Sequence, residues 1–373
     1  MSAVSRHERL RRAVACMAAV LSASVSSVTS TAQSATSTAT AAQVTRVDAL
    51  FADFKAAGSP GAAVAVVRNG AIAFAKGYGL ADIENGVAVT PATSFRLASV
   101  TKQFTAAAIL TLVEAGTLGL DDRLGELLPD VPAYARDVTV RQMLAHTSGV
   151  PDYEPLLGKG DGPQISDRDV LALLRKAKHL YFRSGTSWRY SNSAYALLSL
   201  VVEQKSGVSF AAYLRQRIFD RAGMATAVAH VDGADAVANR AYGHSKDGTG
   251  WRRTDQNRTS AVLGDGGIYA SAEELARWTN ALDANAVMSA ATFASMVEPQ
   301  VLPSGAVTSY GFGWFLDKHH GRRRQRHEGD SIGFRTAIQR YPDDRLTVIV
   351  LTNRGAAPID GLSDGVANIF LAP

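Results

Sequence analysis

Ser99 and Lys102 are the residues of this chain whose types and spacing most directly suggest a reaction. They stand three positions apart, where an alanine-rich apolar run at 104–113 predicts a helix that ends at Gly116. Residues i and i+3 share a helix face, so Lys102 Nζ can reach Ser99 Oγ. A serine hydroxyl needs a base to become a strong nucleophile, and a lysine whose charged form is disfavoured by burial can be that base. The same spacing also fits a helix-capping serine beside a solvated lysine.

Tyr190 and Asn192 form a second pair, in a polar loop before an apolar helix expected at 193–205. Two positions apart in extended backbone, their side chains point the same way. The tyrosine could carry the serine proton to a leaving group, and the asparagine could bind a substrate amide. The alternative is a tyrosine packed on the helix and an asparagine that caps it.

A third group, His327, Gly329 and Asp330, closes a strand expected at 323–327. Glycine permits close approach of the backbone to a ligand. The N–H groups of Ser99 and Asp330 could then form an oxyanion hole, in which one donor is worth about 2.7–4 kcal/mol in other serine enzymes. The alternative is a histidine in a turn at the end of the strand.

In order and spacing, these groups resemble the motifs of the serine β-lactamase and penicillin-binding protein superfamily: Ser99-x-x-Lys102, Tyr190-x-Asn192 and His327-x-Gly329. The chain is similar to D,D-carboxypeptidases, class C β-lactamases and β-lactamase-like esterases, over about 44–370. Three further stretches are family-like and are expected to be structural, as a helix-ending turn at 143–149, a tight turn at 264–267 and a sheet strand at 310–314.

The resemblance implies a two-step reaction that uses neither a metal nor a cofactor. Ser99 attacks a carbonyl carbon, while Lys102 and Tyr190 share the proton transfers. Water then releases the acyl group from Ser99. The residues implied to bind the oxyanion and the substrate are Asn192, His327, Gly329 and Asp330.

The third motif departs from the usual Lys-Thr-Gly, because it reads His327-Glu328-Gly329. This weakens the β-lactamase interpretation and resembles a subset of D,D-peptidases. Glu328 also replaces a hydroxyl that in the family helps to hold a substrate carboxylate, so recognition of a free D-Ala terminus stays open. Nearby arginines could supply the missing charge or could belong to a solvated edge strand: Arg322, Arg323, Arg324, Arg326 and Arg335.

Other reactive-looking residues fit structural roles better. Ser331 lies in Gly329-x-Ser331-x-Gly333, which matches a nucleophile elbow, but that elbow needs a helix after the turn, and 334–341 alternates like a strand. His319 and His320 lack zinc-protease spacing, so no metal site is expected.

The charge balance gives no reason to expect a nucleic-acid or acidic-membrane partner. The 373 residues carry a formal charge of +5, but residues 1–42 hold four of the 39 Lys and Arg and one of the 34 Asp and Glu. The remainder has 35 basic and 33 acidic residues, a net charge of +2. The partner expected is therefore a small-molecule or peptide substrate, such as a peptidoglycan stem peptide or a β-lactam.

The first 42 residues predict a secretory signal followed by a Ser/Thr/Ala tether at 33–43. An apolar run at 13–28 follows four arginines, and cleavage is expected near Ala32 or Ala42. The only cysteine, Cys16, lies in this segment, and no other stretch is long enough to span a bilayer. The mature protein is expected to be secreted or periplasmic, without stable membrane insertion.

The pattern of elements predicts an α+β domain at 43–373. Strands expected at 62–67, 71–78, 310–316, 323–327, 334–341 and 346–351 bracket the chain, and helices are expected at 44–57 and 359–371. One antiparallel sheet built from 43–116 and 301–373, flanked by helices and carrying a mostly helical lobe at 117–300, satisfies this order.

We therefore expect an exported serine hydrolase that cleaves an amide or ester bond through acyl-Ser99. A D-amino-acid peptide is the preferred substrate, as in a D,D-carboxypeptidase. A carboxylic esterase and a β-lactamase are alternatives on the same machinery. A non-catalytic peptidoglycan-binding protein is a further alternative, which the intact set of motifs disfavours.

Overall fold

The computed structural model describes residues 38–158, 160, 162–231, 233 and 236–371. Most of the expected signal and tether lies outside these residues. Helix α1 (Ala41–Leu50) begins inside the expected tether, because Thr40 and Gln43 form a reciprocal capping box. The expected tether at 33–43 is therefore helical at 41–43, and cleavage at Ala42 would cut this helix. None of the helices in the described ranges is long and apolar enough to cross a membrane.

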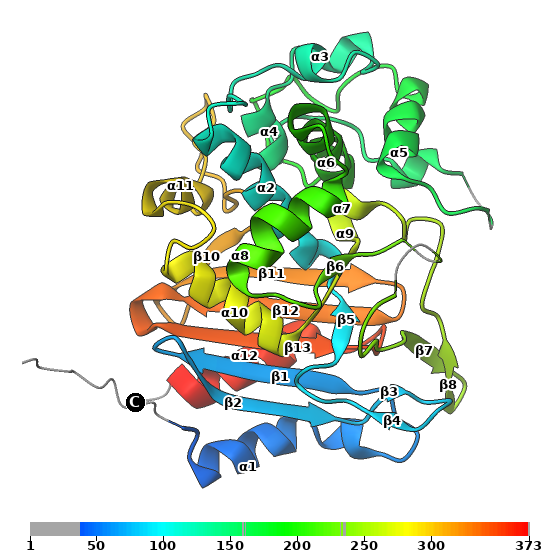
Figure 1. Ribbon diagram of the computed structural model, residues 1–373, viewed down its shortest axis with the longest axis vertical. Helices are drawn as coiled ribbons and strands as arrows, with labels where there is room; N and C mark the ends of the chain where they lie inside the picture. Colours follow the sequence, from blue (N-terminus) through cyan, green and yellow to red (C-terminus); the bar gives the residue numbers. More distant parts are fainter. Residues whose placement is uncertain (1–37, 159, 161, 232, 234–235, 372–373) are drawn as a thin grey trace, which may run out of the picture. The chain divides into compact units, whose positions relative to one another are not determined.

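A six-stranded antiparallel sheet joins the two ends of the chain (Figure 1). Strand β1 pairs with β13 on one side and with β2 on the other, so that Val64 lies opposite Val350. This confirms the expected α+β fold with a sheet built from both ends. In spatial order its strands are β10 (Phe315–His319), β11 (Arg322–Ser331), β12 (Phe334–Tyr341), β13 (Leu346–Thr352), β1 (Ala62–Arg68) and β2 (Ala71–Tyr78).

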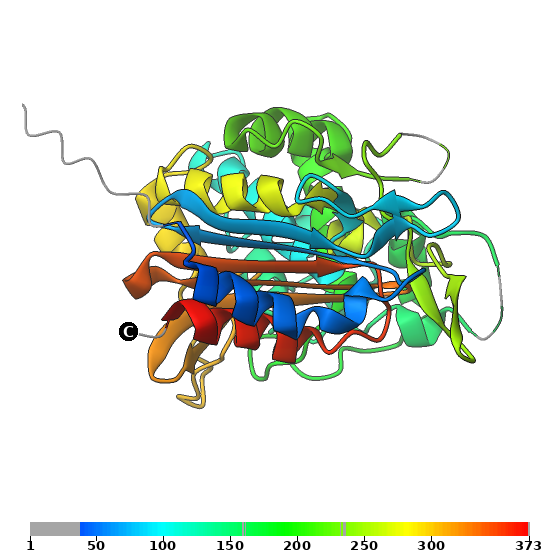
Figure 2. The same ribbon diagram turned by 90° about the horizontal axis from the view of Figure 1, so that it is seen from below.

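Helices cover both faces of this sheet, which is why β1 reads as a continuous apolar run. Figure 2 shows α1 and α12 (Ile359–Leu371) on one face and α10 (Ala272–Asp283) on the other. Side chains alternate along a strand. Val64 and Val66 accordingly pack toward α1 and α12, whereas Ala65 and Val67 belong to the larger core beneath α10 and α2 (Lys102–Glu114).

The middle of the chain is mostly helical, and short strands that were not predicted occur both within it and before it. Capping boxes begin three of its helices, at Thr139, Ser166 and Ser271. The other helices are α3 (Leu124–Leu127), α4 (Val140–Leu144), α5 (Asp167–Leu173), α6 (Asn192–Ser206), α7 (Phe210–Tyr213), α8 (Asp220–Ala222), α9 (Leu263–Gly266) and α11 (Ala290–Met296). The short strands are β3 (Leu80–Asp82), β4 (Val87–Ala88), β5 (Ser94–Arg96), β6 (Val228–Ala229), β7 (His244–Asp247), β8 (Gly250–Arg253) and β9 (Ile268–Ser271).

Short 3₁₀-helical segments, and one π-helical segment at η6, connect several of these elements. They are η1 (Ala52–Lys55), η2 (Ala98–Thr101), η3 (Ala133–Ala135), η4 (Glu154–Leu156), η5 (Leu174–Lys176), η6 (Leu214–Phe219) and η7 (Pro342–Asp344).

The stretch at 310–314 is a loop, so the expected strand at 310–316 is wrong at its start. The chain enters β10 only at Phe315. Gly313 has φ 78°, and a Cβ there would lie 2.8 Å from the carbonyl oxygen of Lys102. The missing side chain lets the loop lie directly against the start of α2.

Candidate active site

Ser99 lies in η2, between the short strand β5 and helix α2. The preceding residue, Ala98, has φ 48°, a left-handed conformation that costs a non-glycine residue about 1–3 kcal/mol. The surroundings fix this bend, because the N–H of Leu97 donates to Ile268 O at 2.8 Å and Thr336 Oγ1 donates to Leu97 O at 2.7 Å. Ser99 is thereby held at the start of the helix and remains partly exposed.

Lys102 is completely buried, and its Nζ has three acceptors. It lies 3.2 Å from Ser99 Oγ, 2.8 Å from Asn192 Oδ1 and 2.9 Å from the carbonyl oxygen of Asp265. Burial lowers the pKa of Lys102 to about 8, against the opposing effect of the Asp265 and Asp152 carboxylates. A substantial fraction of this amine is therefore neutral under mildly alkaline conditions.

The three contacts of Lys102 differ in what they can do when the amine loses its proton. Asn192 Oδ1 and the Asp265 carbonyl can only accept, so they retain the two remaining N–H groups. The lone pair is then left for the Ser99 hydroxyl, which can also donate. The geometry thus orients neutral Lys102 to receive the Ser99 proton.

Tyr190 lies against this pair, with Lys102 Nζ 4.9 Å from its ring centroid. Its hydroxyl oxygen is buried and has no well-formed hydrogen bond among the described residues. Burial raises the pKa of Tyr190 well above its usual value, and this outweighs the lowering effect of nearby Ser99. The phenol therefore keeps its proton at ordinary pH, so Lys102 loses a proton more readily than Tyr190 does.

Asn192 and a set of carboxylates complete the Lys102 side of the site. Asn192 Nδ2 donates to Glu154 Oε1 at 3.4 Å, and Tyr153 Oη donates to Asp265 Oδ2 at 3.0 Å. Burial raises the pKa of Asp265. Glu154 and Asp265 thus form an acidic wall of the cavity, which the sequence analysis did not predict. The 264–267 stretch was expected only to make a turn, and no spacing in the sequence ties residues 152–154 to Lys102.

His327 does not line the cavity beside Ser99, in contrast to its expected substrate-binding role. It is 1% exposed, its Nδ1 donates to Glu328 O at 2.7 Å and its Nε2 accepts from Tyr310 Oη at 3.0 Å. Burial, together with the positive charges of Lys102 and Arg326, lowers the pKa of His327 to about 3. The ring is therefore neutral, and its hydrogen bond with Tyr310 anchors β11 to the loop before β10.

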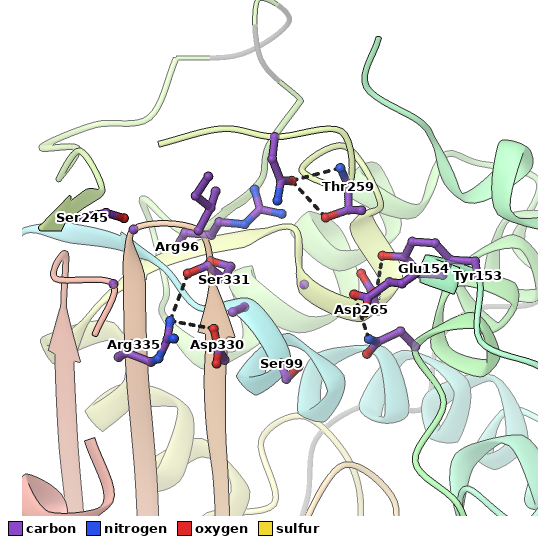
Figure 3. A pocket seen from close by; sticks show the side chains of 17 residues that line it. Arg96, Ser99, Tyr153, Glu154, Ser245, Thr259, Asp265, Asp330, Ser331 and Arg335 are labelled. Atoms are coloured by element: carbon purple, nitrogen blue, oxygen red, sulfur yellow. Dashed lines mark hydrogen bonds and ion pairs between the residues drawn. The ribbon is translucent and has the colours of Figure 1, made fainter. Parts of the chain in front are cut away.

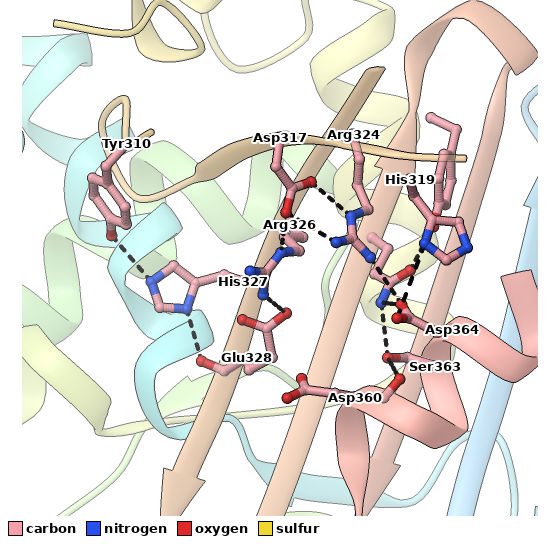
Figure 4. A network of polar contacts seen from close by, with 12 residues as sticks. Tyr310, Asp317, His319, Arg324, Arg326, His327, Glu328, Asp360, Ser363 and Asp364 are labelled. Atoms are coloured by element: carbon pink, nitrogen blue, oxygen red, sulfur yellow. Dashed lines mark hydrogen bonds and ion pairs between the residues drawn. The ribbon is translucent and has the colours of Figure 1, made fainter. Parts of the chain in front are cut away.

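The four arginines of β11 are bound in ion pairs, and Figure 4 shows those of Arg324 and Arg326. Arg326 pairs with Glu328 and, at 2.8 Å, with Asp317. Arg324 binds Asp317 and Asp364 at 2.8 Å each, and the more exposed Arg322 and Arg323 pair with Asp344 and Asp343. They stabilise β11 and hold Glu328. The expectation of an edge strand is wrong here, because β11 is paired with β10 on one side and β12 on the other. Arg335 alone of the five lines the cavity beside Ser99.

Gly329 and Asp330 bring β11 against the turn that carries Ser99. A Cβ at Gly329 would lie 2.2 Å from Leu97 O, so only glycine lets the strand approach this closely. Ser99 and Asp330 both line the same cavity of about 380 Å³, together with Asn192, Glu154 and Asp265 (Figure 3). The cavity thus collects Ser99, Asn192 and Asp330 as expected, while Lys102 and Tyr190 lie immediately behind Ser99.

Ser331 ends β11 and is followed by a turn into β12, which pairs with β11. A hairpin in this place confirms that the Gly329–Gly333 match is not a strand–turn–helix elbow.

His146 supports Tyr190 from the turn after α4. It is fully buried with φ 58°, its Nδ1 accepts from the Ser191 N–H at 3.1 Å, and its ring centroid lies 4.3 Å from that of Tyr190. Burial lowers the pKa of His146 well below its usual value, so the ring is neutral.

Replacing His146 with leucine is expected to destabilise the fold by about 1–3 kcal/mol, because the buried Ser191 N–H loses its acceptor. Urea unfolding measures this effect. His179→Leu, at an exposed histidine, is the matched control and is expected to leave the midpoint unchanged. Equal midpoints for the two variants would contradict the supporting role of His146.

An antiparallel sheet covered by helices, with a serine and a buried lysine at the start of a helix, defines the class of serine hydrolases with a β-lactamase-like fold. The family model described as Beta-lactamase matches residues 47–368. The chain belongs to this family and is a serine hydrolase.

Similarities to individual proteins agree with this assignment. The chain is 31% identical over 306 residues to penicillin-binding protein 4* of Bacillus subtilis, covering 78% of this chain and 67% of the relative. It is 33% identical over 298 residues to a D-aminopeptidase of Brucella ovis, covering 79% of this chain but only 56% of that relative. The structure of a penicillin binding protein from Bacillus halodurans is 29% identical, with a TM-score of 0.74 over 87% of this chain and 98% of that chain.

Proposed function

We propose that this protein hydrolyses an amide bond of a D-amino-acid substrate through an acyl-enzyme at Ser99. The observation that carries the proposal is the buried Lys102 Nζ, placed 3.2 Å from Ser99 Oγ with its other N–H groups held by acceptors. Neutral Lys102 takes the Ser99 proton as Oγ bonds to the carbonyl carbon. General acid–base catalysis of this kind raises the reaction rate by about 10²–10⁴-fold.

The remaining steps use groups around the same cavity. The N–H groups of Ser99 and Asp330 stabilise the oxyanion, and Tyr190 passes the proton to the leaving nitrogen as the C–N bond breaks. Water then attacks the acyl carbon while Lys102 takes a proton from it. Lys102 passes this proton to Ser99 Oγ as the bond between Oγ and the acyl carbon breaks, so that Ser99 leaves as a hydroxyl. His327 contributes to this machinery only through the position of β11.

The acidic wall supports a substrate with a free ammonium group on the acyl residue. Glu154 is exposed at the cavity and joined to Asn192, and Asp265 lies nearby. A cation placed there meets carboxylates, whereas a carboxylate would be repelled. Together with the similarity to D-aminopeptidase, this favours an aminopeptidase or amidase reaction over a carboxypeptidase.

Export remains part of the proposal, with residues 1–42 acting as a secretory leader. Fractionation of cells that express the full chain tests it. The protein is expected outside the cytoplasm and shortened at its N-terminus.

The central test is to treat the protein with an activated fluorophosphonate and with a penicillin, and to locate the modified peptide by mass spectrometry. Modification at Ser99, absent from Ser99→Ala, is the expected result. Hydrolysis of D-alanine p-nitroanilide, a D-Ala-D-Ala peptide, a p-nitrophenyl ester and a cephalosporin then ranks the amidase, carboxypeptidase, esterase and β-lactamase activities. Modification at another residue would overturn the proposed reaction. So would penicillin binding by a protein that hydrolyses none of the four substrates.

The pH dependence follows from the role of Lys102. If its neutral form is the base, kcat/KM rises with pH through an apparent pKa of about 8. Asp265→Asn removes a negative charge that favours the ammonium form, so the rise is expected to move to lower pH. A profile that is flat from pH 6 to 9, or an Asp265→Asn shift to higher pH, would contradict this assignment.

A further inference from the structure

One end of the cavity beside Ser99 contains a buried positive charge that has no carboxylate partner among the described residues. Arg96, in β5, is 3% exposed; its Nη2 donates to Ser260 O at 2.9 Å, and its guanidinium lies 6.0 Å from the Tyr269 ring centroid. Its Nε and Nη1 have no well-formed hydrogen-bond partner among the described residues, although the guanidinium also interacts with the Tyr269 hydroxyl. No carboxylate of the described residues forms an ion pair with it. A buried cation without a counter-ion is costly, so an anion at this end would be stabilised.

Two further donors lie at the same end. Ser331 Oγ is also buried without a hydrogen-bond partner in the described part of the chain. Arg335, from β12, is more accessible and pairs with Asp330 at 2.6 Å, but the Asp330 side chain is 74% exposed. An ion pair with so exposed a partner contributes little, so an incoming anion can compete for Arg335.

The two ends of the cavity therefore differ in sign. Figure 3 shows Arg96, Ser331 and Arg335 on one side, Glu154 and Asp265 on the other, and Ser99 between them. The proposed reaction places the ammonium group of the acyl residue at the acidic wall. The opposite end then receives the side chain of that same residue, and guanidinium and hydroxyl donors match a carboxylate.

We propose that Arg96, Ser331 and Arg335 form an anion subsite that selects an acyl residue with a side-chain carboxylate, such as D-glutamyl or D-aspartyl. Arg335 contacts the carboxylate directly, and Arg96 supplies charge from behind it. This inference rests on the proposed function for the direction in which the substrate lies. The cavity of about 380 Å³ is large enough for one such residue beside Ser99.

The test measures binding without turnover, in protein carrying Ser99→Ala. Calorimetry compares D-isoglutamine, an amide with a side-chain carboxylate, with D-glutaminamide, its uncharged isostere. D-isoglutamine is expected to bind about tenfold more tightly. Adding Arg335→Gln or Arg96→Gln is expected to remove this difference while leaving the affinity for D-glutaminamide within about twofold.

The matched control is Arg323→Gln, an arginine of β11 that pairs with Asp343 outside the cavity. It is expected to leave both affinities unchanged. If circular dichroism shows that Arg96→Gln does not fold, Arg335→Gln alone decides.

Equal affinities for the two amides, equal weakening of both by Arg335→Gln, or no binding of D-isoglutamine at millimolar concentration would each overturn the subsite. These outcomes are distinct from a failure of the proposed function, which is tested separately by labelling Ser99 in the native protein.

Discussion

Lys102→Ala is expected to reduce kcat/KM by about 10²–10⁴-fold, because Ser99 then attacks without its base. The variant also removes a buried amine whose desolvation is costly, so the fold is expected to survive the loss of the three hydrogen bonds. Steady-state kinetics and thermal unfolding separate the two effects.

Two further variants distinguish a base from a positive charge. Lys102→Arg keeps the charge but presents a group that does not lose its proton, so its loss of activity should match that of Lys102→Ala. Lys76→Ala, which removes a surface ion pair with Asp48, should leave kcat/KM unchanged. Activity of Lys102→Arg within tenfold of the native protein would mean that residue 102 acts by its charge alone.

Gly329→Ala is expected to lower kcat by about 10²–10³-fold, as loss of one oxyanion donor does. The added Cβ would meet Leu97 O and Thr336 Oγ1 at 2.2 Å each. Because Leu97 O is a backbone atom, β11 must move away from the turn. This movement carries the Asp330 N–H away from Ser99. Overpacking of this kind also costs about 1–3 kcal/mol of stability, measurable by urea unfolding.

Gly361→Ala is the matched control, since a Cβ at Gly361 in α12 meets nothing within 4 Å. It should be neutral or slightly stabilising, because alanine favours a helix. The double variant Gly329→Ala with Thr336→Ala should not recover activity, since the backbone obstacle remains. Recovery would show that the close approach to Leu97 is unnecessary.

Local signals in the sequence were sufficient for much of the fold. Asn69 and Gly70 separate the two strands expected at 62–67 and 71–78, and both have positive φ, 53° and 79°, as a tight hairpin between β1 and β2 requires. The start of α1 was missed although Thr40 and Gln43 carry the capping-box pattern. The composition of the surrounding Ser/Thr/Ala stretch concealed that signal.

The candidate site was predictable only where its chemistry lies in short motifs. Ser99 and Lys102 are three residues apart, so a helix alone brings them together. Asp265 reaches Lys102 through tertiary packing, which no spacing encodes. His327 carried a recognisable motif, but its partner is Tyr310, and only the loop before β10 determines that contact.

The position of β1 between β13 and β2 constrains how this chain can assemble. Ala62 lies opposite Thr352, so the middle of the sheet stays open until almost the whole polypeptide is present. Contacts so distant along the chain slow folding. In synthesis or translocation the N-terminus comes first. The apolar β1–β2 hairpin must then remain without its partner strand until β13 arrives.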